Sequence, residues 1–281
     1  MRWSICSLML LFSALLAFAP RAAAVDGVVL IHQGTSVNGL PGCPHAGFPI
    51  EICHSGSYRL AGNLDASAVT FLGAIEITAD NVTLDLNGFA VSGAAVCTPG
   101  TYPVQCATLG FGTGVFSFVR NTAVRNGTVR GFGSGVVLAG LGSVIEGVRA
   151  ESNSDASVGA AGISVTNGIV THCTSTANAG DGIRALPFET TVSLNTVSFN
   201  GGFGINGGGS VSNNSVSENG QDGIHNATSA LYNTLFTNIG LGITDDSPEF
   251  GYLGNVMIGN RGGTVFGGQS LGHNLCNGIA C

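Results

Sequence analysis

The chain has 281 residues, of which 45 are glycine, 44% are hydrophobic and only 9% are charged. This composition is typical of a turn-rich β protein with a core, and it excludes a disordered chain, which would be poor in apolar residues. The formal net charge is −7 and all nine basic residues are arginines. Because no basic run is present to neutralise phosphates, nucleic acid is excluded as a partner class.

The first 24 residues have the pattern of a signal peptide. Arg2 precedes an apolar run, 5–18, and Ala22 to Ala24 form a small-residue cleavage site. We expect the mature chain to start at Val25 and to be secreted, periplasmic or at the cell surface. The apolar run is too short to span a bilayer, so no membrane span is expected. The mature chain would carry seven arginines against 16 acids, a net charge of −9.

Residues 25–73 are expected to form an N-terminal cap with lead-in strands, and residues 74–262 to form a repeat. A phrase that starts with asparagine and ends in Gly-Ile recurs at Asn178, Asn200, Asn219 and Asn238, with spacings of 22, 19 and 19 residues. A second asparagine column with nearly the same period comprises Asn195, Asn214, Asn233 and Asn255. A fixed period near twenty predicts stacked identical units rather than one globular core.

Each unit contains short runs of alternating apolar residues cut off by Gly or Asn, which indicates strands. Three strands and three bends fill one coil of 19–22 residues, and strands of successive coils then pair in parallel. One core column is expected to comprise Val115, Val136, Ile163, Ile183, Ile205, Ile224 and Ile243; another comprises Val197, Val216, Leu235 and Met257. The fold class is therefore all-β, a parallel β-helix of about eight coils, capped by residues 263–281.

The recurring asparagines have two predicted roles at the bends. Asn and Gly tolerate the left-handed backbone conformation that a sharp bend requires. Stacked at one bend in consecutive coils, their side-chain amides can also hydrogen-bond along the stack as an asparagine ladder. Cys173 occupies a ladder position, so we expect it to be a buried free thiol.

The other six cysteines of the mature chain fall into three local pairs, as expected for an oxidising destination. Proximity favours Cys43 with Cys53, Cys97 with Cys106, and Cys276 with Cys281. The alternative for the first pair is a zinc site of Cys43, His45, Cys53 and His54, but the spacing matches no common zinc pattern, so no metal is expected.

The chain resembles the secreted right-handed parallel β-helix repeat proteins of pectin-lyase-like architecture. The resemblance is carried by 57–64, by the strand pair in 75–88, by the phrase at 124–131 and by the asparagine repeats. It implies a right-handed helix, with polysaccharide binding or processing as the commonest occupation. Family members also include structural proteins, so a non-enzymatic surface scaffold remains an alternative.

Candidate site residues are those expected to project outward from one strand of each coil. The residue after the Gly-Ile phrase gives Ser164, Arg184, Asn206, His225 and Thr244, and the residue before it gives Asp181, Phe203, Asp222 and Leu241. Two carboxylates could act in glycoside hydrolysis. A lyase reaction could instead use Arg184 or His225 as the base, with calcium offsetting the charge of a uronate; otherwise no cofactor is expected.

Asp181, Arg184, Asp222 and His225 are thus candidate catalytic residues, and Asn206 and Asp245 are candidate binding residues. The alternative is a purely structural role, in which each aspartate accepts hydrogen bonds from the backbone of its own turn. A Phe between them in the column separates the two carboxylates by two coils, which disfavours catalysis.

Two further groups of residues have candidate roles. A column of Arg125, Glu146 and His172 could form an ionic cluster, and Phe203, Tyr232 and Tyr252 could stack on sugar rings. The predicted function is binding or processing of a polysaccharide, with a scaffold protein and a polysaccharide lyase or hydrolase as alternatives.

Overall fold

The computed structural model describes residues 27–69, 73–102, 104–155, 159–186 and 189–281. The predicted signal segment, residues 1–24, lies outside this range. Within it, no helix is long and apolar enough to cross a membrane, and a single short helix is found, α2 (Thr35–Asn38). Everything else of regular structure is strand, as the alternating pattern predicted.

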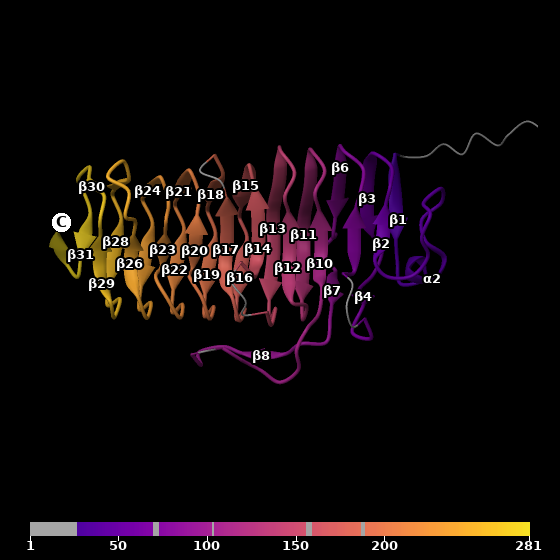
Figure 1. Ribbon diagram of the computed structural model, residues 1–281, viewed down its shortest axis with the longest axis horizontal. Helices are drawn as coiled ribbons and strands as arrows, with labels where there is room; N and C mark the ends of the chain where they lie inside the picture. The colour runs from indigo at the N-terminus through magenta and orange to yellow at the C-terminus, as the bar shows by residue number, and fades with distance from the viewer. Residues whose placement is uncertain (1–26, 70–72, 103, 156–158, 187–188) are drawn as a thin grey trace, which may run out of the picture.

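The strands wind into ten stacked coils that form an elongated rod (Figure 1). One strand of each coil belongs to a ten-stranded, fully parallel sheet, which we call the front sheet. Its strands are β2 (Ile50–Ile52), β5 (Ile75–Ile77), β10 (Thr113–Ser117), β12 (Ser134–Leu138), β14 (Ala161–Thr166), β17 (Asp181–Leu186), β20 (Ile205–Gly207), β23 (Ile224–His225), β26 (Leu241–Thr244) and β29 (Gly263–Phe266).

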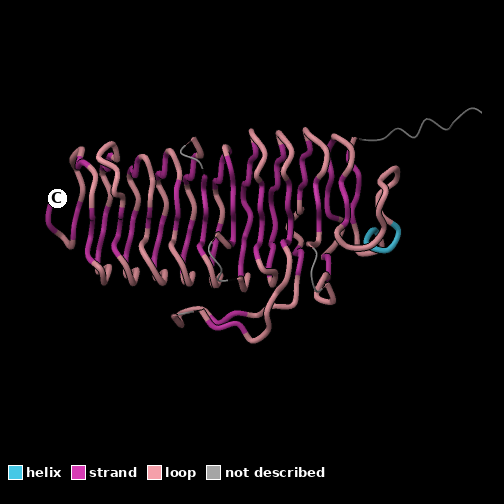
Figure 2. Tube along the Cα trace, viewed as in Figure 1, coloured by secondary structure: helices cyan, strands magenta, loops and turns pink. Residues whose placement is uncertain are grey.

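Twenty of the remaining strands form a second sheet with two columns. Figure 2 shows the strands stacked along the rod. The first column pairs β1 (Val28–Ile31), β3 (Gly56–Leu60), β6 (Val82–Asp85), β11 (Thr122–Arg130), β13 (Ser143–Glu151), β15 (Gly168–Thr171), β18 (Thr191–Ser193), β21 (Ser210–Ser212), β24 (Ser229–Leu231), β27 (Gly251–Leu253) and β30 (Gln269–Ser270). The second pairs β4 (Leu64–Asp65), β7 (Ala90–Ser92), the later halves of β11 and β13, β16 (Thr174–Thr176), β19 (Thr196–Ser198), β22 (Ser215–Ser217), β25 (Thr234–Phe236), β28 (Val256–Ile258) and β31 (Leu275–Cys276).

The coil count differs from the predicted eight. The two additional coils are the outermost ones, with β2 at the N-terminal end and β29 at the C-terminal end. In neither does the core residue, Ile50 or Val265, directly follow a glycine, which was the feature from which most coils were counted in the sequence. Backbone pairing therefore continues past the point where the side-chain repeat stops.

The core is a continuous apolar filling inside the coils. The predicted columns are confirmed, because all seven members of the first and all four of the second are fully buried and stacked in register. Burying an aliphatic side chain contributes about 1.5–3 kcal/mol relative to exposure, so each coil adds its own increment to the stability.

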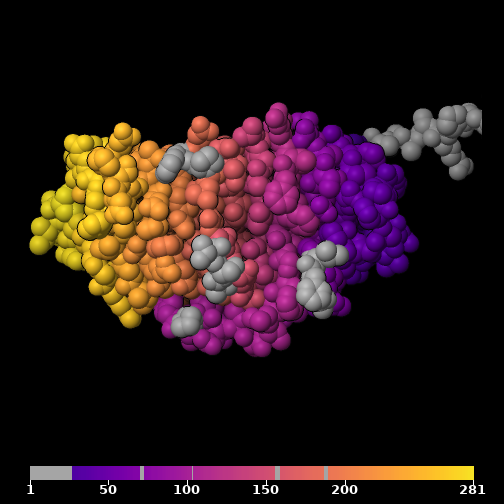
Figure 3. Space-filling view, viewed as in Figure 1, coloured from indigo at the N-terminus to yellow at the C-terminus, as the bar shows by residue number. Residues whose placement is uncertain are grey.

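The three predicted disulfides are present at the two ends and in an insertion. Cys43–Cys53 joins the N-terminal cap to the end of β2, and Cys276–Cys281 closes the antiparallel hairpin of β31 and β32 (Ile279–Ala280). Cys97–Cys106 links the antiparallel strands β8 (Cys97–Thr98) and β9 (Gln105–Cys106) of an arm that packs along the side of the rod (Figure 3). The arm reaches the eighth coil, where a Cβ at Gly220 would lie 3.0 Å from the Tyr102 ring.

Two asparagine ladders run between the coils, as predicted. Asn214 shows the pattern: its Oδ1 accepts from the backbone N–H and the amide of Asn195, at 2.9 and 3.0 Å. Its own amide donates to Oδ1 of Asn233 and to a backbone carbonyl, both at 3.0 Å. Equivalent bonds link Asn153, Asn178, Asn200, Asn219, Asn238 and Asn260 in one ladder and Asn195, Asn214, Asn233, Asn255 and Asn274 in the other.

Cys173 stands at the head of the second ladder and is a buried free thiol, as predicted. Its backbone N–H donates to Oδ1 of Asn195, and its Sγ lies 3.2 Å from the carbonyl oxygen of Thr171. Burial raises the pKa of this thiol to about 11, so it stays protonated at neutral pH.

The left-handed residue is not the ladder asparagine, which corrects the sequence-based prediction. It is the residue directly before it, and that residue is often bulky: φ is 60° at Leu194, 57° at Phe199 and 56° at Tyr232. The ladder position needs an amide that can accept and donate along the stack, so the bend strain falls on the neighbouring residue.

We predict that Asn214→Ala lowers the free energy of unfolding by about 3 kcal/mol. The change removes the acceptor of two buried donors on Asn195 and the donor to a buried carbonyl, and each unpaired group costs about 1–3 kcal/mol. Urea unfolding followed by far-UV circular dichroism measures it. Thr234→Ala, an exposed position on the same sheet, should stay within about 0.5 kcal/mol. Equal effects of the two changes would contradict the role of the ladder.

We also predict that Leu194→Asn stabilises the protein by up to about 1 kcal/mol. The Leu194 side chain is half exposed and its backbone is left-handed, a conformation that Asn adopts with less strain. The same unfolding assay applies, with Leu253→Asn as a control on a strand residue of ordinary φ. A loss of stability at position 194 would show that the leucine contributes more by packing than it costs in strain.

Candidate functional site

The outward residues of the front sheet form one column that runs the length of the rod, here called the outer column. The strand register confirms the predicted stacking of Ser164, Arg184, Asn206, His225 and Thr244. The same register extends the column in both directions, to Glu51, Glu76, Phe116 and Val137 on one side and Phe266 on the other. All ten are half-buried except Phe266, which is exposed.

Asp181 is held by the following coil rather than by its own turn. Its Oδ1 accepts from the backbone N–H of Phe203 at 3.0 Å, and its Oδ2 accepts from the amide of Asn206 at 2.8 Å. The residue is 8% exposed, and burial raises the pKa of its carboxyl in spite of these two hydrogen bonds and the nearby charge of Arg184.

Asp222 repeats the arrangement two coils further on with a different partner. Its Oδ1 accepts from the backbone N–H of Leu241 at 2.7 Å, and its Oδ2 lies 3.3 Å from Nδ1 of His225. Burial acts to raise the pKa of this carboxyl, but the contacts from His225, Leu241 and Thr244 outweigh it and the pKa is lowered. The two aspartates therefore have opposite shifts in similar positions.

His225 and Phe203 fill the space between the two aspartates. Their rings are stacked nearly parallel, with centroids 4.1 Å apart and an interplanar angle of 5°. One face of Phe203 is thus covered by the imidazole. Arg184 points elsewhere, toward Gly159, where a Cβ would lie 2.8 Å from a guanidinium nitrogen. Of the four candidate catalytic residues, the structure therefore brings Asp222 and His225 into direct contact and turns the guanidinium of Arg184 toward Gly159.

Beside the outer column lies a hollow of about 580 Å³, here called the central groove. It is lined by Leu186, Asn206, Asn226, Thr228, Asp245, Asp246, Ser247, Glu249 and Phe250. Both predicted binding residues, Asn206 and Asp245, therefore line it. Asp245 is 5% exposed and its Oδ1 accepts from the backbone N–H of Ser247, so it mainly shapes the wall. Asp246 and Glu249 are exposed, and no hydrogen bond or ion pair within the described residues reaches their carboxylates.

The groove exists because neighbouring coils have connections of different length. From the outer column to the next strand the chain takes seven residues at Arg184 to Thr191 and at Thr244 to Gly251. It takes only four in the two coils between, Asn206 to Ser210 and His225 to Ser229. Two long connections thus flank two short ones, about 14 Å apart at three coil spacings.

Asp246 and Glu249 were not among the residues predicted from the sequence. The available signal was the spacing of the asparagines, which is 22 residues where the long connections occur and 19 between them. In the long connection after Thr244, the residues that line the groove are Asp245, Asp246, Ser247, Glu249 and Phe250. The number of residues per repeat therefore indicates where long surface connections occur, in addition to indicating the fold.

Other predicted sites are not formed. Glu146 pairs with Arg125 and Thr171 in strand register, while His172 is a left-handed bend residue, so the expected cluster of Arg125, Glu146 and His172 is wrong. Tyr252 packs against the core and stacks on Phe250, whereas Tyr232, directly after β24 of the same twenty-stranded sheet, is exposed.

The zinc alternative is also excluded by the bonding. Cys43, Cys53 and His54 form the one group of three potential ligands within mutual reach in the described part of the chain, but the two sulfurs are joined in a disulfide. His45, the fourth proposed ligand, pairs with Glu51 instead.

Comparisons with known proteins concern the fold. No protein-family model and no curated protein matches the chain. Among solved structures it is similar to the Dettilon tailspike protein, with a TM-score of 0.53 and 17% identity over 80% of this chain and 53% of that one. It is also similar to the A-module of the mannuronan C-5 epimerase AlgE4 of Azotobacter vinelandii, with a TM-score of 0.49 and 12% identity over 87% and 80% of the two chains.

The chain spans about half the length of that tailspike. At these identities the likeness shows the fold alone, a parallel β-helix of the pectin-lyase-like kind that the sequence resembles.

We predict opposite pH dependence for two isosteric substitutions. Asp181→Asn removes a carboxylate whose raised pKa makes ionisation costly, so it should raise stability at pH 7, with the gain shrinking as pH falls through the native pKa toward about 3.9. Asp222→Asn removes a carboxylate whose lowered pKa makes ionisation favourable. It should lower stability at pH 7, with the loss vanishing as pH falls below about 3.9.

Urea midpoints measured between pH 3 and 8 test both changes. Parallel curves for the two variants would contradict the opposite environments of the two aspartates.

Proposed function

We propose that the protein is exported and binds a polysaccharide through its front face, at the central groove and the adjoining outer column. The observation that carries this proposal is the groove itself. It combines an apolar wall of Leu186 and Phe250 with amide, hydroxyl and carboxylate groups on the other sides. Binding sites are typically concave and largely apolar with a few placed polar groups.

The charge of the groove favours a ligand without carboxylates. Asp245, Asp246 and Glu249 line it and no basic residue does. The net charge of the chain is also negative. A polymer of neutral or amino sugars donates hydrogen bonds to carboxylates, whereas a uronate polymer would be repelled.

Binding is favoured over catalysis because the candidate acids are already engaged. Both oxygens of Asp181 accept hydrogen bonds from the next coil, and both oxygens of Asp222 have partners. These contacts fix the outer column and leave neither carboxyl aimed at a substrate. Lyase or hydrolase activity at Asp181 and Asp222 would require these contacts to be broken.

Three disulfides and the predicted signal segment support export to an oxidising compartment. A cell-surface scaffold without ligand is the competing proposal, since the stacked coils and closed ends would suit it equally.

Binding of oligosaccharides to the wild type and to the double variant Asp246→Asn, Glu249→Gln tests the proposal. We expect at least about a tenfold loss of affinity, because each carboxylate contributes charge-assisted hydrogen bonds worth about 1.5–3 kcal/mol. Neither side chain caps a turn, so folding should be unaffected. Isothermal titration calorimetry with neutral, amino and uronate oligosaccharides provides the measurement.

Glu146→Gln, a half-buried carboxylate on the opposite sheet, is the matched control. Equal affinity of the double variant and the wild type would refute the groove as the site. New reaction products in mass spectra of the mixtures would favour an enzyme, and no binding of any glycan would favour the scaffold.

A further inference from the structure

A second hollow lies at the other end of the front face, here called the N-terminal pocket. It has a volume of about 370 Å³ and is lined by His45, Ala46, Phe48, Pro49, Glu51, Glu76 and Phe116. Its floor belongs to the first three coils, through β2, β5 and β10. Glu51, Glu76 and Phe116 are consecutive members of the outer column, so the pocket and the central groove share one surface.

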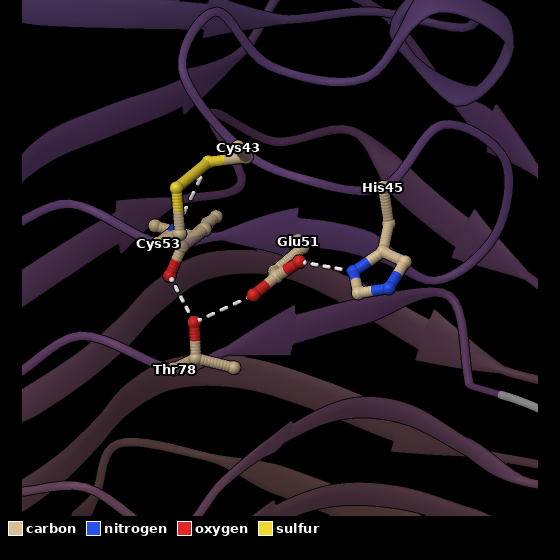
Figure 4. Close-up of polar contacts among 6 residues, drawn as sticks. Cys43, His45, Glu51, Cys53 and Thr78 are labelled. Atoms are coloured by element: carbon tan, nitrogen blue, oxygen red, sulfur yellow. Dashed lines mark hydrogen bonds and ion pairs between the residues drawn. A yellow bond between two sulfur atoms is a disulfide. The ribbon is translucent and has the colours of Figure 1, made fainter.

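Glu51 is held in place by two side chains (Figure 4). Its Oε2 lies 2.7 Å from Nδ1 of His45, and its Oε1 accepts from the hydroxyl of Thr78 at 3.1 Å. The hydrogen bond from His45 lowers the pKa of Glu51, so the carboxylate is ionised at neutral pH. The Glu51 side chain is 12% exposed and the imidazole 74%, which places the pair at the mouth of the pocket.

Glu76 follows Glu51 on the next coil, about 4.8 Å away along the stack, and has no such partner. No hydrogen bond or ion pair within the described residues reaches its carboxylate, although the residue is half-buried. An ionised carboxylate only accepts hydrogen bonds, so a ligand that binds to the carboxylate oxygens of Glu76 has to donate hydrogen bonds to them. A second negative charge beside Glu51 makes any anionic ligand unfavourable.

The lining of the pocket next to Glu76 is apolar and well packed. The Phe116 ring lies against Gly73, where a Cβ would come within 2.7 Å of it, and makes an edge contact with Phe118. Phe48 and Pro49 complete this side. The wall therefore offers a flat hydrophobic surface whose position is fixed before any ligand binds.

We propose that the N-terminal pocket is a second glycan subsite that takes one pyranose unit with donor groups, a neutral or amino sugar and not a uronate. The C–H face of the ring lies on Phe116, and its hydroxyl or ammonium groups donate to Glu76. This inference rests on the proposed function, since it assigns a further subsite to the same polysaccharide.

The spacing of the two sites sets the length of the ligand. Glu76 and Asn206 are five coils apart in the outer column, or about 24 Å at 4.8 Å per coil. A polymer that spans this distance occupies both sites at once, so the second contact is intramolecular and raises the overall affinity. A shorter oligosaccharide occupies only one of them.

The test compares the isosteric variant Glu76→Gln with the wild type on ligands of two lengths. The probes are a neutral β-glucan, a chitosan and an alginate, each as polymer and as oligosaccharides too short to span about 24 Å. Binding is measured by calorimetry with Glu146→Gln as control. We expect at least about a fivefold loss of affinity for the preferred polymer and no change for its short oligosaccharides in the central groove.

The arms of this experiment separate the possible results. If Glu76→Gln loses affinity for chitosan alone, and loses more of it at low salt, the ligand is an amino sugar. If it loses affinity for β-glucan by an amount that does not depend on salt, the ligand is a neutral sugar. Unchanged polymer affinity in Glu76→Gln, with the Asp246→Asn, Glu249→Gln double variant still impaired, overturns this inference and leaves the proposed function standing. Tight binding of alginate, or no binding of any probe by the wild type, overturns both.

Discussion

Each coil of this molecule has to place its bends directly above those of the coil before it. The reason is that the backbone hydrogen bonds of parallel strands hold successive coils at a fixed spacing of about 4.8 Å. The asparagine ladders satisfy this requirement. A ladder amide accepts two hydrogen bonds from one neighbour and donates to the next, so a misplaced bend would leave several buried groups unpaired. The cost of such an error is what fixes the register of the whole stack.

The same constraint explains why bulky residues occupy strained positions. Leu194, Phe199 and Tyr232 have left-handed backbones that cost about 1–2 kcal/mol for a residue with a Cβ. Each stands directly before a ladder asparagine whose buried hydrogen bonds offset that strain. The strain is tolerated because the ladder determines the bend. The backbone conformation of these residues is set by their place before a ladder asparagine and not by their own backbone preference.

Repetition also determines how much of the protein could be predicted from its sequence. The strands, both core columns, the ladders and the stacking of Arg184, Asn206 and His225 follow from a period that the sequence displays directly. The outermost coils were missed because backbone pairing continues where the glycine before the core residue is absent. The cluster of Arg125, Glu146 and His172 was wrong because a bend displaced one member by a single residue, which changes the direction of its side chain.

Surface chemistry could be predicted less well, because it depends on departures from the repeat. The central groove lies beside the long connection that follows Thr244, where the two preceding coils have short connections. The N-terminal pocket is formed where a cap loop bearing His45 and Phe48 folds over the first coils. In both places a regular outer column meets an irregular segment, and carboxylates lie beside an apolar wall. A perfectly regular solenoid would present a uniform face, so the irregular segments are where a ligand of defined length and charge can be distinguished from others.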